Sequence, residues 1–192
     1  NYMGDVFEIL TIIISFSLCG IIASEIKNNT LVFPLCSGKK LFDIILGKLV
    51  VYGLMIFCIS VASLIINYIY SGILFGFEIS ILPILYGGLL HGFYMVYLIS
   101  CLLMYGVITR TPILSGFLTL ATVYGVHIIS SLLNFQIWTP SGLIIQAQKL
   151  TLVDRSNVYI SVIVTILLIL AFITFALYKL KNLEWNTRNE IS

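Results

Sequence analysis

Five long apolar runs constrain this chain more than any other feature of its sequence. They cover about residues 5–24, 42–70, 81–108, 113–133 and 158–180. A helix needs roughly 20 mainly apolar residues to cross a bilayer, and every run meets that length. Residues 42–70 exceed it, so we expect this helix to tilt or to extend past the bilayer.

Composition and pattern together indicate the fold class. Only 9% of the residues are charged, whereas soluble domains have about 25%. The runs are continuously apolar, and strands of a membrane β-barrel would alternate instead. The sequence therefore predicts an all-α integral membrane protein with five transmembrane helices, in which residues 1–192 form a single transmembrane domain.

The basic residues predict the orientation of the helices. If the five spans alternate in direction, eight Lys and Arg residues fall on one side and two on the other. The eight are Lys27, Lys39, Lys40, Lys48, Arg110, Lys179, Lys181 and Arg188, and the two are Lys149 and Arg155. The positive-inside rule makes the first side cytoplasmic. The loop 25–41 and the tail 181–192 are then cytoplasmic, and the segment 134–157 is external.

Two further expectations follow from this topology. Five alternating spans leave residue 1 outside, so we expect one more span before Asn1, which gives six in the full chain and both ends in the cytoplasm. Within the external segment, residues 142–152 are rich in Leu and Ile. We expect an interfacial or re-entrant helix there, resting against the outer leaflet.

The loop 25–41 reads EIKNNTLVFPLCSGKKL and is polar between two apolar runs. Its apolar patch consists of Thr30, Leu31, Val32 and Phe33. We expect Pro34 to end any continuing helix, Lys39 and Lys40 to meet anionic headgroups, and Lys48 to snorkel from the next span. The pattern fits an amphipathic segment on the cytoplasmic surface, and it also fits a simple charged turn.

The same loop contains a fragment of a phosphate-binding motif, SGKK at residues 37–40. The complete motif needs a glycine five residues before its last glycine, and a Ser or Thr after its lysine. Here Phe33 and Lys40 stand at those two positions. We therefore expect no ATP binding by this chain.

The stretch EIKNNTLVFPLCSGKKLFDIILGKLVVYG resembles the signature of type-2 ATP-binding-cassette (ABC) export permeases. That signature has an acid, a Gly-Thr-Leu-like step, a proline, a small residue, a basic residue and a lysine at the head of the next helix. Asn29 stands where the family often has glycine, and Gly38 with Lys39 replaces its usual Ser-Arg pair. The matching residues, in order, are Glu25, Thr30, Leu31, Pro34, Ser37, Lys39 and Lys48.

The resemblance implies a function for this loop. In such transporters it forms a coupling helix that docks in a groove on a separate ATPase subunit. Leu31, Val32 and Phe33 would supply the apolar anchor, and Lys39 or Lys40 the charge at the rim. ATP-driven closure of two ATPase subunits would then move the spans as rigid bodies.

The resemblance also implies the assembly. The chain would be the multi-pass permease subunit of an exporter in a bacterial inner or plasma membrane, acting as a homodimer with two ATPase subunits. Its cargo would be an amphiphilic peptide, drug or lipid. ATP and magnesium would bind the partner subunit, so this chain would supply no catalytic residue and no metal ligand and would bind no nucleic acid.

The third run contains polar and small residues that allow two interpretations. Gly88 and Gly92 form a small-xxx-small step that lets helices approach closely. Tyr94 and Tyr97 are either packing residues or, with His91, part of a substrate path between two permease subunits. A neutral His91 could equally donate to a carbonyl across a helix interface.

Two other function classes are alternatives to an ABC permease. An ATP-independent secondary transporter or channel would be favoured by an inverted repeat or by a broken helix with a mid-membrane acid, and the sequence displays neither. An integral membrane enzyme would need clustered His, Asp or Glu, whereas His91 and His127 are isolated.

The four cysteines have no metal-ligand spacing, so we expect reduced thiols.

Overall fold

The computed structural model describes residues 2–77, 80–148 and 156–182, and these residues form helices without any strand. The helices are α1 (Tyr2–Ser17), α2 (Gly20–Lys27), α3 (Val32–Cys36), α4 (Leu41–Phe75), α5 (Ile81–Thr109), α6 (Pro112–Leu132), α7 (Ser141–Gln148) and α8 (Ser156–Lys181), with a 3-10 turn η1 (Gln136–Trp138).

Five segments are long and apolar enough to cross a bilayer, and this confirms the predicted fold class. They are Phe7–Lys27, Leu41–Phe75, Ile81–Thr109, Pro112–Leu132 and Val158–Lys181. The chain is therefore a membrane-spanning helical bundle.

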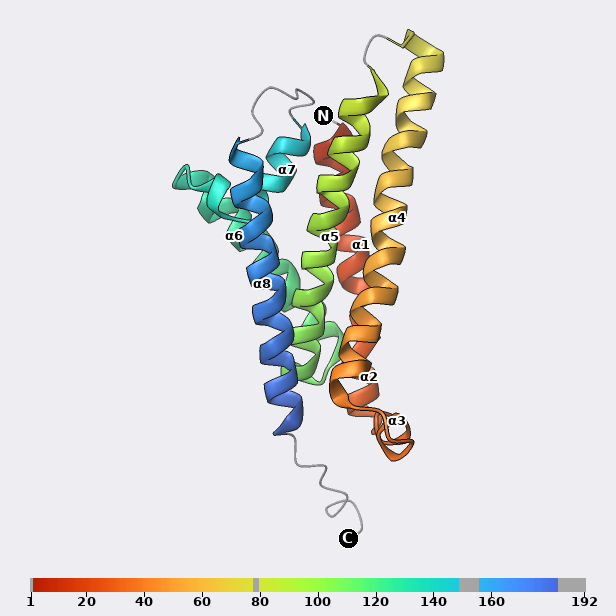
Figure 1. Cartoon of the computed structure of the whole chain (residues 1–192), viewed down its shortest axis with the longest axis vertical. Coiled ribbons are helices and arrows are strands. Elements are labelled where there is room, and N and C mark those ends of the chain that lie inside the picture. Colours follow the sequence, from red (N-terminus) through yellow and green to blue (C-terminus); the bar gives the residue numbers. More distant parts are fainter. Residues whose placement is uncertain (1, 78–79, 149–155, 183–192) are drawn as a thin grey trace.

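Helix α5 forms the centre of the bundle (Figure 1). Of its most apolar stretch 72% is buried, against 28% in each of α4, α6 and α8. Met95, Leu98 and Ile99 of α5 have no exposed surface. The surrounding helices turn large apolar side chains outward, among them Leu54 and Leu167. Such outward apolar faces are what a lipid environment favours.

The first span is interrupted between α1 and α2, at Leu18 and Cys19. The predicted first span, about residues 5–24, is confirmed as the segment Phe7–Lys27, and two consecutive helices form it. Ser115 of α6 donates its hydroxyl to the carbonyl of Cys19 at 3.0 Å, and the amide of Ile21 donates to Leu18 at 3.0 Å. The Cys19 carbonyl also accepts the first hydrogen bond of α2, so Ser115 adds a contact across the bundle. The freed carbonyl of Phe16 accepts from the Cys19 thiol at 2.9 Å, so the break is satisfied locally.

Helices α4 and α5 pack closely at the two glycines of α5. A Cβ at Gly88 would lie 3.6 Å from Val61 and Leu64, an ordinary contact distance. A Cβ at Gly92 would lie 2.7 Å from the ring of Phe57. Of these two glycines, Gly92 is therefore the one that cannot carry a side chain without displacing a neighbour.

Helix α4 is longer than the bilayer requires. Its 35 residues span about 52 Å, compared with a hydrocarbon core of about 30 Å. In Figure 1 its C-terminal end rises beyond α5 and the other helices. This length fits the expectation that the helix tilts or extends past the bilayer.

The described basic residues gather at one end of the bundle, which we call the lysine end. The segment containing α3, the turn between α5 and α6, and the C-terminal end of α8 all lie there (Figure 1). The basic residues are Lys27, Lys39, Lys40, Lys48, Arg110, Lys179 and Lys181. Lys149, Arg155 and Arg188, which the topology also used, lie outside the described residues.

Helix α7 lies within the bundle and not on its surface. Leu143, Ile144 and Ala147 are at most 2% exposed, and a Cβ at Gly142 would lie 2.3 Å from the Ser161 hydroxyl of α8. A helix is confirmed in the described part of residues 142–152, and its burial is at odds with the interfacial alternative, whereas the re-entrant alternative stays a prediction. The apolar side chains of residues 142–148 are covered by neighbouring helices in place of lipid.

We expect Gly92→Ala to destabilise the bundle and Gly88→Ala to leave it nearly unchanged. The added methyl at residue 92 must displace Phe57, and overpacking of this kind costs about 1–3 kcal/mol. The methyl at residue 88 meets only ordinary contacts. Unfolding in mixed detergent micelles, followed by far-UV circular dichroism, measures both variants. Equal losses of stability would contradict the assigned close contact.

Candidate functional site

An ion pair joins the end of the first span to the start of the second. Lys48 of α4 donates its Nζ to the Oε1 of Glu25 in α2 at 2.7 Å, and to the backbone carbonyl of Ile21 at 2.8 Å. The Lys48 side chain is 15% exposed and that of Glu25 is 36% exposed. Charge-assisted hydrogen bonds shielded from water are strong, so this pair braces α2 against α4.

The chain leaves α2 through a Schellman motif. The amide of Thr30 donates to the carbonyl of Glu25 at 2.9 Å, and the amide of Asn29 donates to Ile26 at 3.2 Å. Asn29 has a φ of 55°, in the left-handed region that this motif needs and that glycine adopts without strain. Asparagine is among the non-glycine residues that best tolerate it. Asn29 stands where type-2 ABC permeases often have glycine, and a glycine could adopt the same left-handed backbone.

Helix α3 ends in a second Schellman motif. The amide of Lys39 donates to the carbonyl of Pro34 at 3.1 Å, and that of Gly38 to Leu35 at 3.0 Å. Gly38 has a φ of 84°. The expectation that Pro34 ends a helix is wrong, because Pro34 lies inside α3. A proline in the first turn removes no intrahelical hydrogen bond, and Gly38 ends the helix instead.

The side chains of this loop divide into an inward and an outward set. Leu31 has no exposed surface, Val32 is half-buried, and Phe33 is 75% exposed. Lys39 and Lys40 are exposed. Of the three residues expected as an apolar anchor, Phe33 alone offers its whole ring to a partner. Leu31 anchors the loop to its own bundle.

The residues expected along a substrate path lie in the core. Tyr94 and Tyr97 are 1% and 2% exposed, and Tyr94 packs edge-on against Phe7 with ring centres 5.2 Å apart. His91 is 3% exposed, and its Nδ1 lies 2.5 Å from the hydroxyl of Ser60 on α4. In this arrangement all three lie within one chain, and His91 pairs with a hydroxyl and not with a carbonyl.

The polar residues Thr11 and Ser15 of α1 were not singled out from the sequence, and His127 was treated only as an isolated histidine. The hydroxyls of Thr11 and Ser15 and the Nδ1 of His127 are buried without a hydrogen-bond partner among the described residues. The four-residue spacing of Thr11 and Ser15, which places both on one helix face, is the sequence signal for this cluster. Within the described part of the chain no three His, Cys, Asp or Glu residues could hold a metal ion, and the cysteines are free thiols.

The fold and the loop define a multi-pass helical membrane protein with a braced polar segment at its lysine end. Comparisons with protein-family models, with curated proteins and with solved structures find no match for this chain.

We expect Asn29→Val to lower the stability of the bundle by about 1–2 kcal/mol, because a left-handed backbone is costly for a β-branched residue. Asn28→Val is the matched control, since Asn28 is also exposed and has a φ of −91°. Asn29→Gly should be tolerated. Chemical unfolding in detergent compares the three variants, and equal effects of valine at both positions would refute the assigned geometry.

We expect Glu25→Gln and Lys48→Met each to destabilise the bundle by about 1–3 kcal/mol, since each removes one partner of a charge-assisted hydrogen bond. The double variant should lose less than the sum of the two single losses, because no unpaired charge remains. A double-mutant cycle on the unfolding free energy measures this coupling. Strict additivity would show that the two side chains do not interact.

Proposed function

We propose that this chain is the permease subunit of an ATP-driven exporter, related to the type-2 ABC permeases, and that α3 is its coupling helix. The observation that carries the proposal is the braced loop at the lysine end, from which the ring of Phe33 projects. In the proposal, a separate ATPase subunit receives that ring.

Force transmission requires a loop that is fixed to the helices it moves. Leu31 is buried in the bundle, and the pair of Lys48 with Glu25 holds α2 against α4. The Schellman motifs at Asn29 and Gly38 fix the direction of α3. A displacement of α3 would therefore move the first two spans together, as rigid-body mechanisms require.

The outward side of the loop has the chemistry of a docking surface. An exposed aromatic ring with cations nearby fits the anatomy of protein interfaces, in which aromatic anchors are surrounded by a polar rim. Phe33 would be the anchor, and Lys39 and Lys40 the rim. The positive-inside rule places the lysine end in the cytoplasm, where ATP and magnesium would bind the ATPase.

The proposed assembly contains two copies of this chain and two ATPase subunits in a bacterial inner or plasma membrane. The cargo would be an amphiphilic peptide, drug or lipid. Catalysis of ATP hydrolysis would belong to the partner, and this chain would not act as an enzyme.

A second candidate is an ATP-independent carrier or channel, and the interruption of the first span at Leu18 and Cys19 favours it. Carriers of that kind bind ions or substrates at broken helices. Here Ser115 already occupies the carbonyl of Cys19. The acid at the end of the same span, Glu25, is held by Lys48. The break is therefore weaker support than the braced loop.

We expect Phe33→Asp to abolish co-purification with the ATPase subunit that the unchanged protein retains, when both are expressed together and extracted in mild detergent. The ring is 75% exposed, so its replacement should leave the bundle folded while placing a charge at the anchor of the interface. Loss of an interface hot spot costs about 2–4 kcal/mol, which is a loss of affinity of roughly 30-fold to 1,000-fold.

Phe75→Asp is the control, because Phe75 is 81% exposed and lies at the opposite end of the bundle (Figure 1). This variant should retain the ATPase. Undiminished ATPase binding by Phe33→Asp would refute α3 as the coupling helix. Cargo flux in proteoliposomes without nucleotide or ATPase would favour the carrier.

A further inference from the structure

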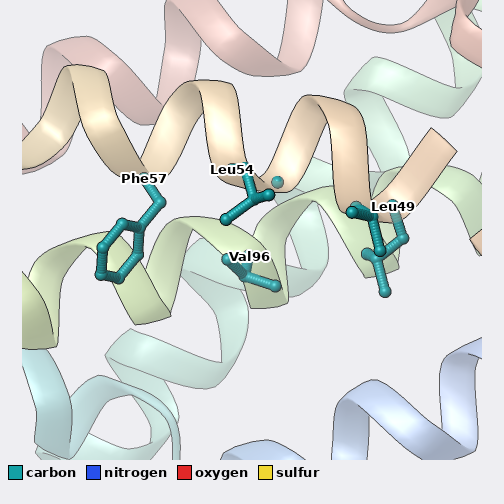
Figure 2. A pocket seen from close by; sticks show the side chains of 6 residues that line it. Leu49, Leu54, Phe57 and Val96 are labelled. Atoms are coloured by element: carbon teal, nitrogen blue, oxygen red, sulfur yellow. The ribbon is translucent and has the colours of Figure 1, made fainter. Parts of the chain in front are cut away.

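A groove opens between α4 and α5 on the outer surface of the bundle (Figure 2). It has a volume of about 310 Å³, and apolar side chains line it together with one glycine. The lining residues are Leu49, Val50, Gly53, Leu54, Phe57 and Val96. Val50 and Leu54 are 46% and 60% exposed, so the groove opens toward the surroundings of the protein.

The dimensions of the groove fit a single alkyl chain. From Leu49 to Phe57 it follows α4 for about 12 Å, close to the thickness of roughly 15 Å of one hydrocarbon leaflet. Its volume of 310 Å³ over that length gives a mean cross-section of about 26 Å². A helix about 10 Å in diameter has a cross-section of roughly 80 Å². A helix of a second copy would therefore rest across the groove and insert only side chains into it, whereas a single alkyl chain would lie along its whole length.

Charge identifies the kind of lipid. Leu49, at one end of the groove, follows the braced Lys48 directly in α4. Lys40 precedes α4 by one residue and is exposed, as is Lys39. Lys40 lies about 14 Å below Leu49 along the helix axis, and a lysine stem can reach upward along the apolar surface. A lipid phosphate beyond the Leu49 end of the groove would therefore lie at the level of Lys39 and Lys40.

The excess of positive charge at the lysine end also favours an anionic lipid. Among the described residues, seven Lys and Arg and two carboxylates, Glu25 and Asp43, lie there. This excess attracts anionic headgroups, whereas a zwitterionic lipid gains little from it. A bound lipid of either charge would bury the same apolar surface, so the lysines decide the preference.

We propose that this groove binds one anionic phospholipid from the leaflet at the lysine end, with an acyl chain along Leu49 to Phe57 and the phosphate near Lys39 and Lys40. The inference does not depend on the proposed exporter function. Native mass spectrometry of the protein released from bicelles of equal phosphatidylglycerol and phosphatidylcholine tests it. We expect one retained phosphatidylglycerol per chain.

The variant Gly53→Leu fills the groove. A Cβ at Gly53 meets only the methyl groups of Val96, at 3.8 Å, so the backbone can accept a side chain. We expect at least a tenfold loss of retained phosphatidylglycerol. Gly47→Leu is the matched control, because Gly47 lies on α4 outside the groove with nothing within 4 Å of its added Cβ. It should retain the lipid.

The double variant Lys39→Ala with Lys40→Ala should reduce the preference for phosphatidylglycerol over phosphatidylcholine at least fivefold. Equal retention of both lipids by the unchanged protein would overturn the assignment of an anionic ligand. Retention by Gly53→Leu equal to that of Gly47→Leu would overturn the groove as the site. A stable dimer that Gly53→Leu dissociates would replace the lipid with a second copy as the occupant.

A second measurement keeps the test valid if Gly53→Leu fails to fold. Leu54→Trp reports on the groove, and Leu167→Trp, on the outward face of α8, is a control with a similar exposure of 59%. With Trp138 and Trp185 replaced by Phe, chain-brominated phosphatidylglycerol should quench Leu54→Trp at least twice as strongly as brominated phosphatidylcholine. It should quench Leu167→Trp equally with either lipid. Equal quenching at Leu54→Trp would also overturn the proposal.

Discussion

The structure depends on one constraint: no backbone polar group can face hydrocarbon without a partner. Continuous helices meet it along most of each span, and the informative places are those where a helix stops. At the break in the first span, the Leu18 carbonyl accepts from the Ile21 backbone amide and the Phe16 carbonyl accepts from the Cys19 thiol. In the Schellman motifs at Asn29 and Gly38, backbone amides that follow the helix donate to carbonyls of its last turn. The loop at the lysine end is ordered because its backbone is satisfied locally.

The second organising element is the burial of α5 by six of the other helices, α1, α2, α4, α6, α7 and α8. Helix α5 has its small residues where neighbours come closest, as at Gly92 against α4 and at Gly106, whose added Cβ would lie 2.6 Å from Ile22 of α2. In lipid, van der Waals contact and shape are the main forces between helices. The aromatic cluster of Tyr94 and Tyr97 belongs to this core.

The spans could be predicted because length and apolarity are local properties of the sequence. The contact of Ser115 with the Cys19 carbonyl could not, since the two residues lie far apart along the chain. The same holds for α7, whose apolar residues are as suitable for lipid as for α5 and α8. In the loop, the pattern of residues located the polar segment correctly, but whether Leu31 or Phe33 faces outward depends on the bundle beneath α3.

The loop and the groove meet on α4. Lys48, which braces the loop, directly precedes Leu49, which begins the groove. Any movement of α4 that a partner imposes through α3 must change the separation of α4 from α5, and hence the shape of the groove. A ligand that binds two shapes with different affinity shifts the equilibrium between them, and the coupling is reciprocal. A lipid held in the groove would therefore bias the position of the loop, and a partner on the loop would bias the affinity for the lipid.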